Sequence, residues 1–476
     1  MTELIKKKLS DSAAARWSAL VIVSFTMMAA YFLTDVMSPL ESMLERTAAD
    51  NGMGMGWSST EYGFFSGSYG FINVYLLMLF FGGLILDRMG IRFTGILATG
   101  LMVVGAGLKF YAISFVSPEP TTYVNIPFLG LSHAMVKNQV LLAALGFSIF
   151  GVGAEISGIT VSKIIAKWFK GHNMALAMGL QVALARLGTA LALGLSPLIA
   201  KSAGNLSAPI LLAWVCLLIG LLAFMVYCVM DKRLDASLVA SRVATNQKAA
   251  EDEKFHFRDL GAIFTSTGFW LITLLCLLFY SGVFPFLKFA AKLMTAKYGV
   301  DPVFAGSIPA VDPFGTILLT PVFGIIYDRI GHGATLMLIG SFILTLVHVC
   351  FALPIFQTAG FAIVLMIFLG IAFSLVPSAL WPSVPKIIPM KQLGSAYAII
   401  FYIQNIGLAM VPILIGHVLE RCTVVSSIGE TVTDFTTAMC IFAAFGIAAI
   451  LLALTLRIVD GKFGYGLEKS NVEKKG

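Results

Sequence analysis

Two residues of opposite charge, Glu155 and Arg186, lie inside long apolar segments at equal distances from a short basic turn, residues 167–173. If both segments are antiparallel helices, each charge lies about 22 Å of helix rise from the turn, so the two share one depth. An arginine binds a carboxylate through two hydrogen bonds, and a carboxylate accepts hydrogen bonds from an ammonium group. Two interpretations follow. The residues neutralise each other as a buried pair, or they face a water-filled cavity and bind a substrate that carries both charges.

The composition requires a membrane around these segments. Apolar residues make up 58% of the 476 residues and charged residues only 12%, about half the charged fraction of soluble proteins. The apolar runs are continuous rather than alternating and reach the roughly 20 residues of a spanning helix. We therefore predict an all-α membrane protein with twelve transmembrane helices, at residues 17–38, 63–86, 95–116, 139–165, 174–199, 207–230, 266–290, 303–327, 334–355, 359–383, 393–418 and 436–458.

The net charge of +7 is explained by topology. With both termini in the cytoplasm, most of the 32 Lys and Arg residues fall on the cytoplasmic side, which follows the positive-inside rule. This distribution leaves no basic patch for a nucleic acid. The long hydrophilic connection at 231–265 divides the chain, and we predict an N-terminal six-helix half (1–230), a cytoplasmic central loop (231–265) and a C-terminal six-helix half (266–476).

A short motif occurs once in each half, which indicates an internal duplication. The motif follows the second predicted span and recurs after the eighth, about half a chain length later. Its glycines allow close approach of helix ends, and its charges lie at the membrane surface, where ion pairs can form and break. The residues are Gly83, Asp87, Arg88, Gly90 and Arg92 in the first copy, and Gly324, Asp328, Arg329 and Gly331 in the second.

This duplicated motif in a twelve-span chain resembles the major facilitator superfamily over essentially the whole sequence. The resemblance implies two pseudo-symmetric six-helix halves, a binding site near the midplane and alternating access by rocking of the halves. The motif residues would then form a cytoplasmic gate. The second copy departs from the first, because His332-Gly333 stands where the first has Ile91-Arg92, so an asymmetric gate is expected.

A narrower resemblance is to the lysosomal dipeptide transporter branch of this superfamily. It implies that Glu155 binds the α-ammonium group and Arg186 the α-carboxylate of a dipeptide, and that Asp35 has a counterpart in the branch. The matching segments are 151–155, 167–171, 179–181, 185–188, 283–286, 380–382, 392–397 and 403–409.

The other charges within spans have several interpretations. Lys109 and Lys288 lie near the outer ends of their spans, where a long side chain can reach the headgroups. Asp35 is either a helix-end cap or part of a vestibule. Asp312 is a protonatable coupling group, a partner for Lys288 or a capped helix break. Neither Asp312 nor Lys288 belongs to the pattern of the dipeptide transporter branch. Titration of Asp312 or Glu155 during transport would make the protein a proton symporter.

Several polar and aromatic residues are weaker candidates for the site. Gln404 and Asn405 either contact substrate or hydrogen-bond a neighbouring helix. Trp381 belongs to an aromatic belt or to the site, and Tyr280 lines a cavity or packs. The six cysteines have no metal-binding spacing and are expected to pack as small apolar residues, so we expect no metal and no cofactor.

These observations favour a transporter of small zwitterionic peptides, facilitative or secondary active. The alternative is an organic or inorganic anion carrier in which Arg186 binds the anion and Glu155 is structural. The sequence contains no catalytic motif of the zinc-protease, serine-elbow or phosphate-loop type, so we expect no enzyme. Short tails and loops favour a bacterial cytoplasmic membrane, with the lysosomal membrane as the alternative. We expect a monomer, and the sequence identifies no accessory subunit.

Overall fold

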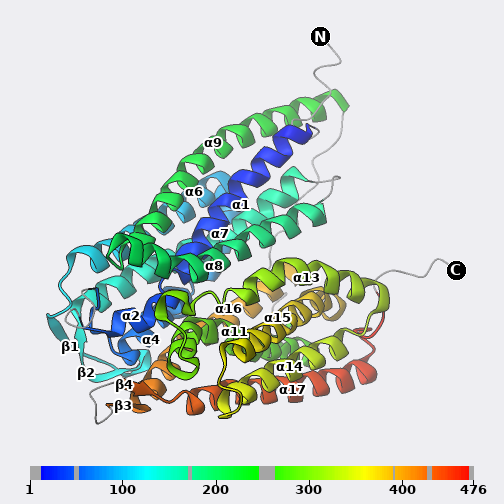
Figure 1. The fold of residues 1–476 in the computed structure, drawn as a ribbon. Coiled ribbons are helices and arrows are strands. Elements are labelled where there is room, and N and C mark those ends of the chain that lie inside the picture. The colour runs from blue at the N-terminus through cyan, green and yellow to red at the C-terminus, as the bar shows by residue number, and fades with distance from the viewer. Residues whose placement is uncertain are drawn as a thin grey trace.

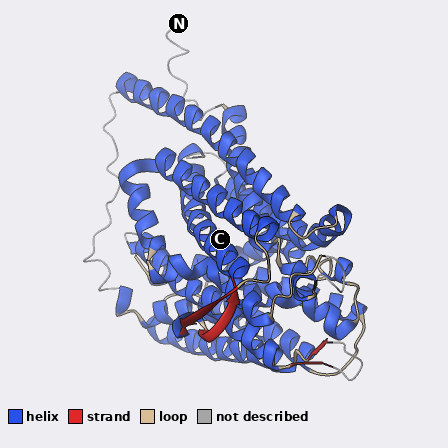
Figure 2. Ribbon diagram, turned by 90° about the vertical axis from the view of Figure 1, so that its left-hand side faces the viewer, coloured by secondary structure: helices blue, strands red, loops and turns tan. Residues whose placement is uncertain are grey.

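Helices make up most of the described part of the chain, and the strands described there form two short hairpins (Figure 2). The computed structural model describes residues 12–47, 53–169, 174–245, 263–389, 392–425 and 431–470. The last four residues of the basic turn and positions 246–262 of the predicted central loop lie outside these ranges. The long helices are α1 (Ala13–Asp35), α6 (Met78–Phe115), α7 (Asn138–Trp168), α8 (Met174–Ala203), α9 (Ala208–Thr245), α11 (Thr267–Tyr298), α13 (Val311–Ile330), α14 (Gly333–Ala352), α15 (Ala359–Ile387), α16 (Leu393–Arg421) and α17 (Thr436–Phe463).

Ten helices of the described chain are long and apolar enough to cross a membrane. The predicted spans at 63–86 and 303–327 are not among them as separate helices. The first is divided into α4 (Ser59–Gly67), a 3-10 turn (Ser68–Gly70), α5 (Phe71–Tyr75) and the start of α6. The second corresponds to α12 (Pro302–Ala305) and the 20-residue α13, which carries both acidic and basic residues. Together with these two divided segments, the ten long helices form the all-α membrane protein that the sequence predicts.

The division of the span at 63–86 has a tertiary cause. Two of its glycines pack directly on α16, and a Cβ added at Gly67 would lie 2.3 Å from the carbonyl oxygen of Ala409. A Cβ at Gly70 would meet the Ala409 side chain at 2.8 Å. The chain between these glycines follows the surface of α16 as a 3-10 turn, and Leu77 then adopts a left-handed conformation (φ 54°) before α6 begins.

The helices form two groups that converge at one end of the molecule (Figure 1). The group α1, α6, α7, α8 and α9 packs together, chiefly through α6 on α7 and through α1 on α8 and α9. The group α11 and α13–α17 packs through α14 on α17 and through α13 on α15. The hydrophilic segment after position 231 begins as helix, because α9 continues to Thr245.

Both hairpins lie at the end where the groups converge, which we call the hairpin end (Figure 1). Strands β1 (Thr121–Ile126) and β2 (Leu131–Lys137) pair antiparallel, with Thr121 opposite Lys137. Strands β3 (Thr423–Val425) and β4 (Thr431–Thr433) form the second hairpin. The two groups diverge toward the opposite end, where both termini lie. We call this the termini end.

The two motif copies share one backbone feature at the termini end. Gly90 turns the chain within α6 (φ 78°, ψ 172°), and Gly331 follows α13 with φ 80°. A left-handed φ is readily adopted only by glycine. The last glycine of each copy therefore makes an equivalent turn between consecutive spans.

Candidate ligand-binding cavity

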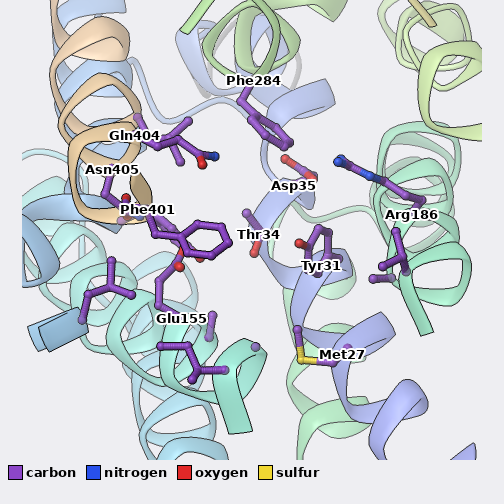
Figure 3. Close-up of a pocket in the computed structure, with 18 of the residues that line it drawn as sticks. Met27, Tyr31, Thr34, Asp35, Glu155, Arg186, Phe284, Phe401, Gln404 and Asn405 are labelled. Carbon is purple, nitrogen blue, oxygen red and sulfur yellow. Dashed lines mark hydrogen bonds between the residues drawn. The ribbon is translucent and has the colours of Figure 1, made fainter. Parts of the chain in front are cut away.

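A cavity of about 360 Å³ lies between the two groups of helices. Its walls come from α1, α7 and α8 of the first group and from α11 and α16 of the second. Figure 3 shows Glu155 and Arg186 on opposite walls, with Asp35 and Tyr31 of α1 between them. A polar cavity at the junction of two helix groups is a common location for a small-molecule site.

Glu155 is held on the α7 wall by hydrogen bonds. The hydroxyl of Tyr69 donates to Glu155 Oε1 at 2.9 Å, and the Asn405 side chain is a second partner. Tyr69 comes from the 3-10 turn after α4, and Asn405 comes from α16 of the other group. The carboxylate is therefore oriented by both halves and keeps an edge toward the cavity (Figure 3).

Arg186 is held on the α8 wall by aromatic rings. Its guanidinium group lies 4.5 Å from the ring centre of Phe373 and 5.2 Å from that of Phe284. Cation–π contacts of this kind contribute up to about 2 kcal/mol in a desolvated site. Within the described chain no carboxylate lies within 4.0 Å of Arg186, so the guanidinium group remains available to an anionic ligand.

The neutralising pair of Glu155 and Arg186 is therefore not formed. The physical reason lies in the packing: α1 contacts α8 extensively and also contacts α7, whereas α7 and α8 make little contact. The two charges belong to helices on opposite sides of the cavity, and their common depth stays a prediction.

Asp35 joins the two groups at the hairpin side of the cavity. Its Oδ1 lies 2.6 Å from Lys288 Nζ of α11, and Thr189 of α8 donates to its Oδ2 at 2.8 Å. Lys288 also donates to the carbonyl oxygen of Thr34 at 2.7 Å. Lys288 thus points into the protein and not toward the headgroups, and its partner is Asp35 rather than Asp312.

The headgroup interpretation is also wrong for Lys109. This side chain is fully buried, its ammonium group donates to the carbonyl oxygen of Leu33 at 3.2 Å, and it lies over the rings of Phe65 and Phe147. Lys109 therefore ties α6 to the end of α1.

The remaining candidates divide into two layers. Gln404 and Asn405 line the cavity. Tyr280 and Trp381 do not: Trp381 Nε1 donates to the Tyr280 hydroxyl at 3.0 Å, and the Trp381 ring stacks on Phe401, which itself lines the cavity. These two residues support the wall from behind.

Asp312 lies in the first turn of α13 and is fully buried. Neither carboxylate oxygen has a hydrogen-bond partner in the described structure, and the side chain does not cap the helix. Asp312 does not line the cavity.

The motif residues form ion pairs within their own half. Asp87 pairs with Lys163 of α7 at 2.7 Å, and Arg92 lies 3.1 Å from Asp235 of α9. Arg88 is exposed, and Gly83 has open space around it. In the second half, Asp328 and Arg329 are exposed at the end of α13, while His332 pairs with Glu468 at 2.8 Å.

Three residues at the site carried no signal in the sequence. Thr189, Phe373 and Phe401 belong to apolar runs and resemble ordinary packing residues, so only the lateral arrangement of helices identifies them. The described residues contain no group of three or more metal-ligating side chains.

The family is decided by a match that extends over most of the sequence. The model of the Major Facilitator Superfamily matches residues 20–412 and, in a second match, residues 286–469. The chain belongs to the major facilitator superfamily. It is an integral, multi-pass membrane transporter with the fold of that family, as the duplicated motif predicted.

Curated relatives include the human protein "Lysosomal dipeptide transporter MFSD1". It is 25% identical over 461 residues, which cover 95% of this chain and 89% of the relative. The Danio rerio protein of the same name is 27% identical over 362 residues, covering 74% and 71% of the two chains. The narrower resemblance of the sequence is therefore confirmed at low identity.

Solved structures with the same fold include sugar transporters. An inward-open conformation of the xylose transporter XylE from E. coli has a TM-score of 0.66 at 15% identity, covering 97% of this chain and 98% of that one. A D-xylose–proton symporter has a TM-score of 0.64 at 17% identity, with coverage of 92% and 97%. At this identity the similarity establishes the fold alone.

Proposed function

We propose that this protein transports dipeptides by alternating access, with Glu155 binding the α-ammonium group and Arg186 the α-carboxylate. The observation that carries the proposal is an acid and a base on opposite walls of one cavity, neither of which forms an ion pair within the described residues. Two opposite charges that do not neutralise each other match a ligand with opposite charges at its two ends. The names of the curated relatives support the same substrate class.

If the protein binds a dipeptide through its α-ammonium and α-carboxylate groups, the side chains of the dipeptide lie in the apolar part of the cavity. Met27, Leu79 and Phe401 line that part and offer no directional hydrogen bond. We therefore expect broad tolerance of dipeptide side chains, with selectivity against longer peptides set by the spacing of the two charged residues.

Alternating access requires that the two halves close on the ligand at one end at a time. The halves meet at the hairpin end and diverge at the termini end (Figure 1), and we propose that the ligand reaches the cavity from the termini side. We propose that the motif residues Asp87, Arg88, Arg92, Asp328 and Arg329 close that end later in the cycle. The domain boundaries of this scheme are residues 1–230, 231–265 and 266–476.

The compartment and assembly are also proposals. The short loops between the spans favour a bacterial cytoplasmic membrane, while the relatives' names favour a lysosomal membrane. In both cases the termini face the cytoplasm, so release would occur on that side. The cavity is formed by a single chain, and we propose that the monomer is the functional unit.

A ligand panel tests the proposed substrate. A ligand that binds the native state raises the melting temperature of the purified protein. Free dialanine is expected to raise it, and dialanine with either terminus capped is expected to have a much smaller effect. Stabilisation by simple dicarboxylates alone would contradict the proposal and favour an anion carrier that uses Arg186.

A further inference from the structure

Asp312 is a fully buried carboxyl group with no hydrogen-bond partner in the described structure. Of the three interpretations from the sequence, two are excluded by geometry. The side chain does not cap α13, and Lys288 is occupied by Asp35 and Thr34. A buried, unpaired carboxylate anion is very costly, so a group in this position carries a proton.

Asp312 and Arg186 lie against the same face of α15. A Cβ added at Gly370 would lie 3.5 Å from the Asp312 Cα and 3.7 Å from its Oδ1. Phe373, three residues further along α15, packs on the Arg186 guanidinium group at 4.5 Å. Residues three apart on a helix are neighbours on one face, separated by about 4.5 Å of rise. The acid and the base are therefore about one helical turn apart along α15.

Arg186 is the charged group that faces Asp312. The elements packed on α13 are chiefly α15 and α8. Between positions 362 and 378, α15 carries no titratable side chain, and α8 carries only Arg186 between positions 179 and 200. On α13 itself the next titratable group is Tyr327, far along the helix. The field of Arg186 reaches Asp312, although the two do not form an ion pair.

Arg186 belongs to the first half of the transporter and Asp312 to the second. Rocking of the halves changes the separation between side chains on α8 and α13, so the two can pair in one state and separate in another. Arg186 thus has two competing anionic partners, the carboxylate of the ligand and that of Asp312.

We propose that Asp312 is a proton-binding site that couples a proton to each substrate molecule through competition for Arg186. When Asp312 binds a proton from the hairpin side, Arg186 is free to bind the substrate carboxylate. After the substrate leaves at the termini side, Asp312 releases its proton to that side and pairs with Arg186 for the return. This inference rests on the proposed function and adds proton symport to it.

Transport in proteoliposomes of phosphatidylethanolamine and phosphatidylglycerol tests the proposal, with the membrane potential held at zero. A gradient of about one pH unit, acid on the hairpin side, should give about tenfold accumulation of labelled dialanine at one proton per substrate. Asp312→Asn should abolish this accumulation and retain exchange of labelled for unlabelled dialanine, because exchange needs no net proton movement. The matched control is Asp301→Asn, which removes a carboxylate from the cap of α12 and keeps a capping side chain.

The proposal would be overturned if Asp312→Asn accumulated dialanine as strongly as the wild type does. It would also be overturned if this variant melted at the wild-type temperature but had lost both accumulation and exchange. A second measurement needs no variant. Calorimetric titration of the wild type with dialanine, repeated in buffers of different ionisation enthalpy, should reveal proton uptake on binding, and its absence would also overturn the proposal. Wild-type protein that equilibrates labelled dialanine without accumulating it under the pH gradient contradicts the inference alone, whereas no dialanine binding or exchange contradicts the proposed function as well.

Discussion

Glu155 and Arg186 are held by different kinds of contact on the two walls of the cavity. Glu155 accepts a hydrogen bond from Tyr69, whereas Arg186 lies against two aromatic rings and forms no ion pair within the described residues. A common depth for the two, which stays a prediction, could be derived from the sequence, because helix rise is uniform and both lie equally far from one turn. Their aromatic and hydroxyl partners could not, since residues such as Phe373 and Thr189 are brought to the site only by the lateral packing of helices.

Tyr69→Phe tests the support of Glu155. The change removes one hydrogen bond to a charged group, worth about 1.5–3 kcal/mol, so the affinity for dialanine should fall about tenfold or more. Isothermal titration provides the affinity. Tyr402→Phe is the matched control, because the Tyr402 hydroxyl donates to the carbonyl oxygen of Val74 and not to Glu155. Equal affinities for the two variants would show that Tyr69 does not orient the carboxylate.

At the scale of elements, α11 closes the hairpin end by means of two lysines one turn apart. Lys288 binds Asp35 at the end of α1, and Lys292 binds Glu45 of α2 (Glu41–Glu45) and lies 3.6 Å from Glu41. Lys292 also donates to Ser59 of α4 at 2.7 Å. Each ion pair joins the two halves, so the set must break when the hairpin end opens.

Lys292→Met should therefore open the hairpin end more often, since it leaves Glu41 buried without a cation. In a background without the native cysteines, a thiol reagent added on the hairpin side should label Ser66→Cys in the cavity faster. Lys297→Met is the control, because Lys297 binds carbonyl oxygens of Phe351 and Leu353 within its own half. The same labelling rate in both variants would exclude Lys292 from the closure.

The motif turn makes a second prediction at this scale. Gly90 has a left-handed φ of 78° and open space around it, so Gly90→Ala should destabilise through backbone strain alone, by about 1–2 kcal/mol. Gly100 lies in helical backbone with equally open space, so Gly100→Ala should not destabilise the protein. Melting temperatures of the two purified variants compare them directly, and an unchanged value for Gly90→Ala would contradict the assigned turn.

At this scale, the features that the sequence could not predict depend on tertiary contacts. Hydropathy located most of the apolar helices, because a bilayer demands continuous apolar runs, but not all of their ends, since α9 continues to Thr245 and α11 to Tyr298. It could not reveal that the span at 63–86 is interrupted, since the interruption follows from the contact of Gly67 and Gly70 with α16. The short hairpins were also missed, because strands such as β3, with three residues, leave no alternating pattern to detect.

At the scale of the whole molecule, the duplicated motif identified the architecture, and the equivalent turns at Gly90 and Gly331 follow from it. The same sequence must support every state of the cycle, so the arrangement of the halves could not be predicted. Here the halves meet at the hairpin end and diverge at the termini end (Figure 1).

Substrate binding should shift this arrangement toward closure of the termini end. Spin labels at Leu176→Cys of α8 and Ile330→Cys of α13, both exposed positions near that end, should approach each other when dialanine is added. Pulsed electron paramagnetic resonance measures the distance. The distance between labels at Leu176→Cys and Met89→Cys, which lie within one half, should not change. An unchanged distance between Leu176→Cys and Ile330→Cys under saturating dialanine would contradict rocking of the halves.

The most direct test of the central claim combines ligand caps with site variants in one binding measurement. In the wild type, capping the amino terminus of dialanine should weaken binding strongly, because the cap removes the charge that pairs with Glu155. In Glu155→Gln the same cap should change the affinity little, while a cap on the carboxyl terminus should still weaken binding; Arg186→Ala should abolish binding of the free dipeptide. An undiminished effect of the amino cap in Glu155→Gln would contradict the account.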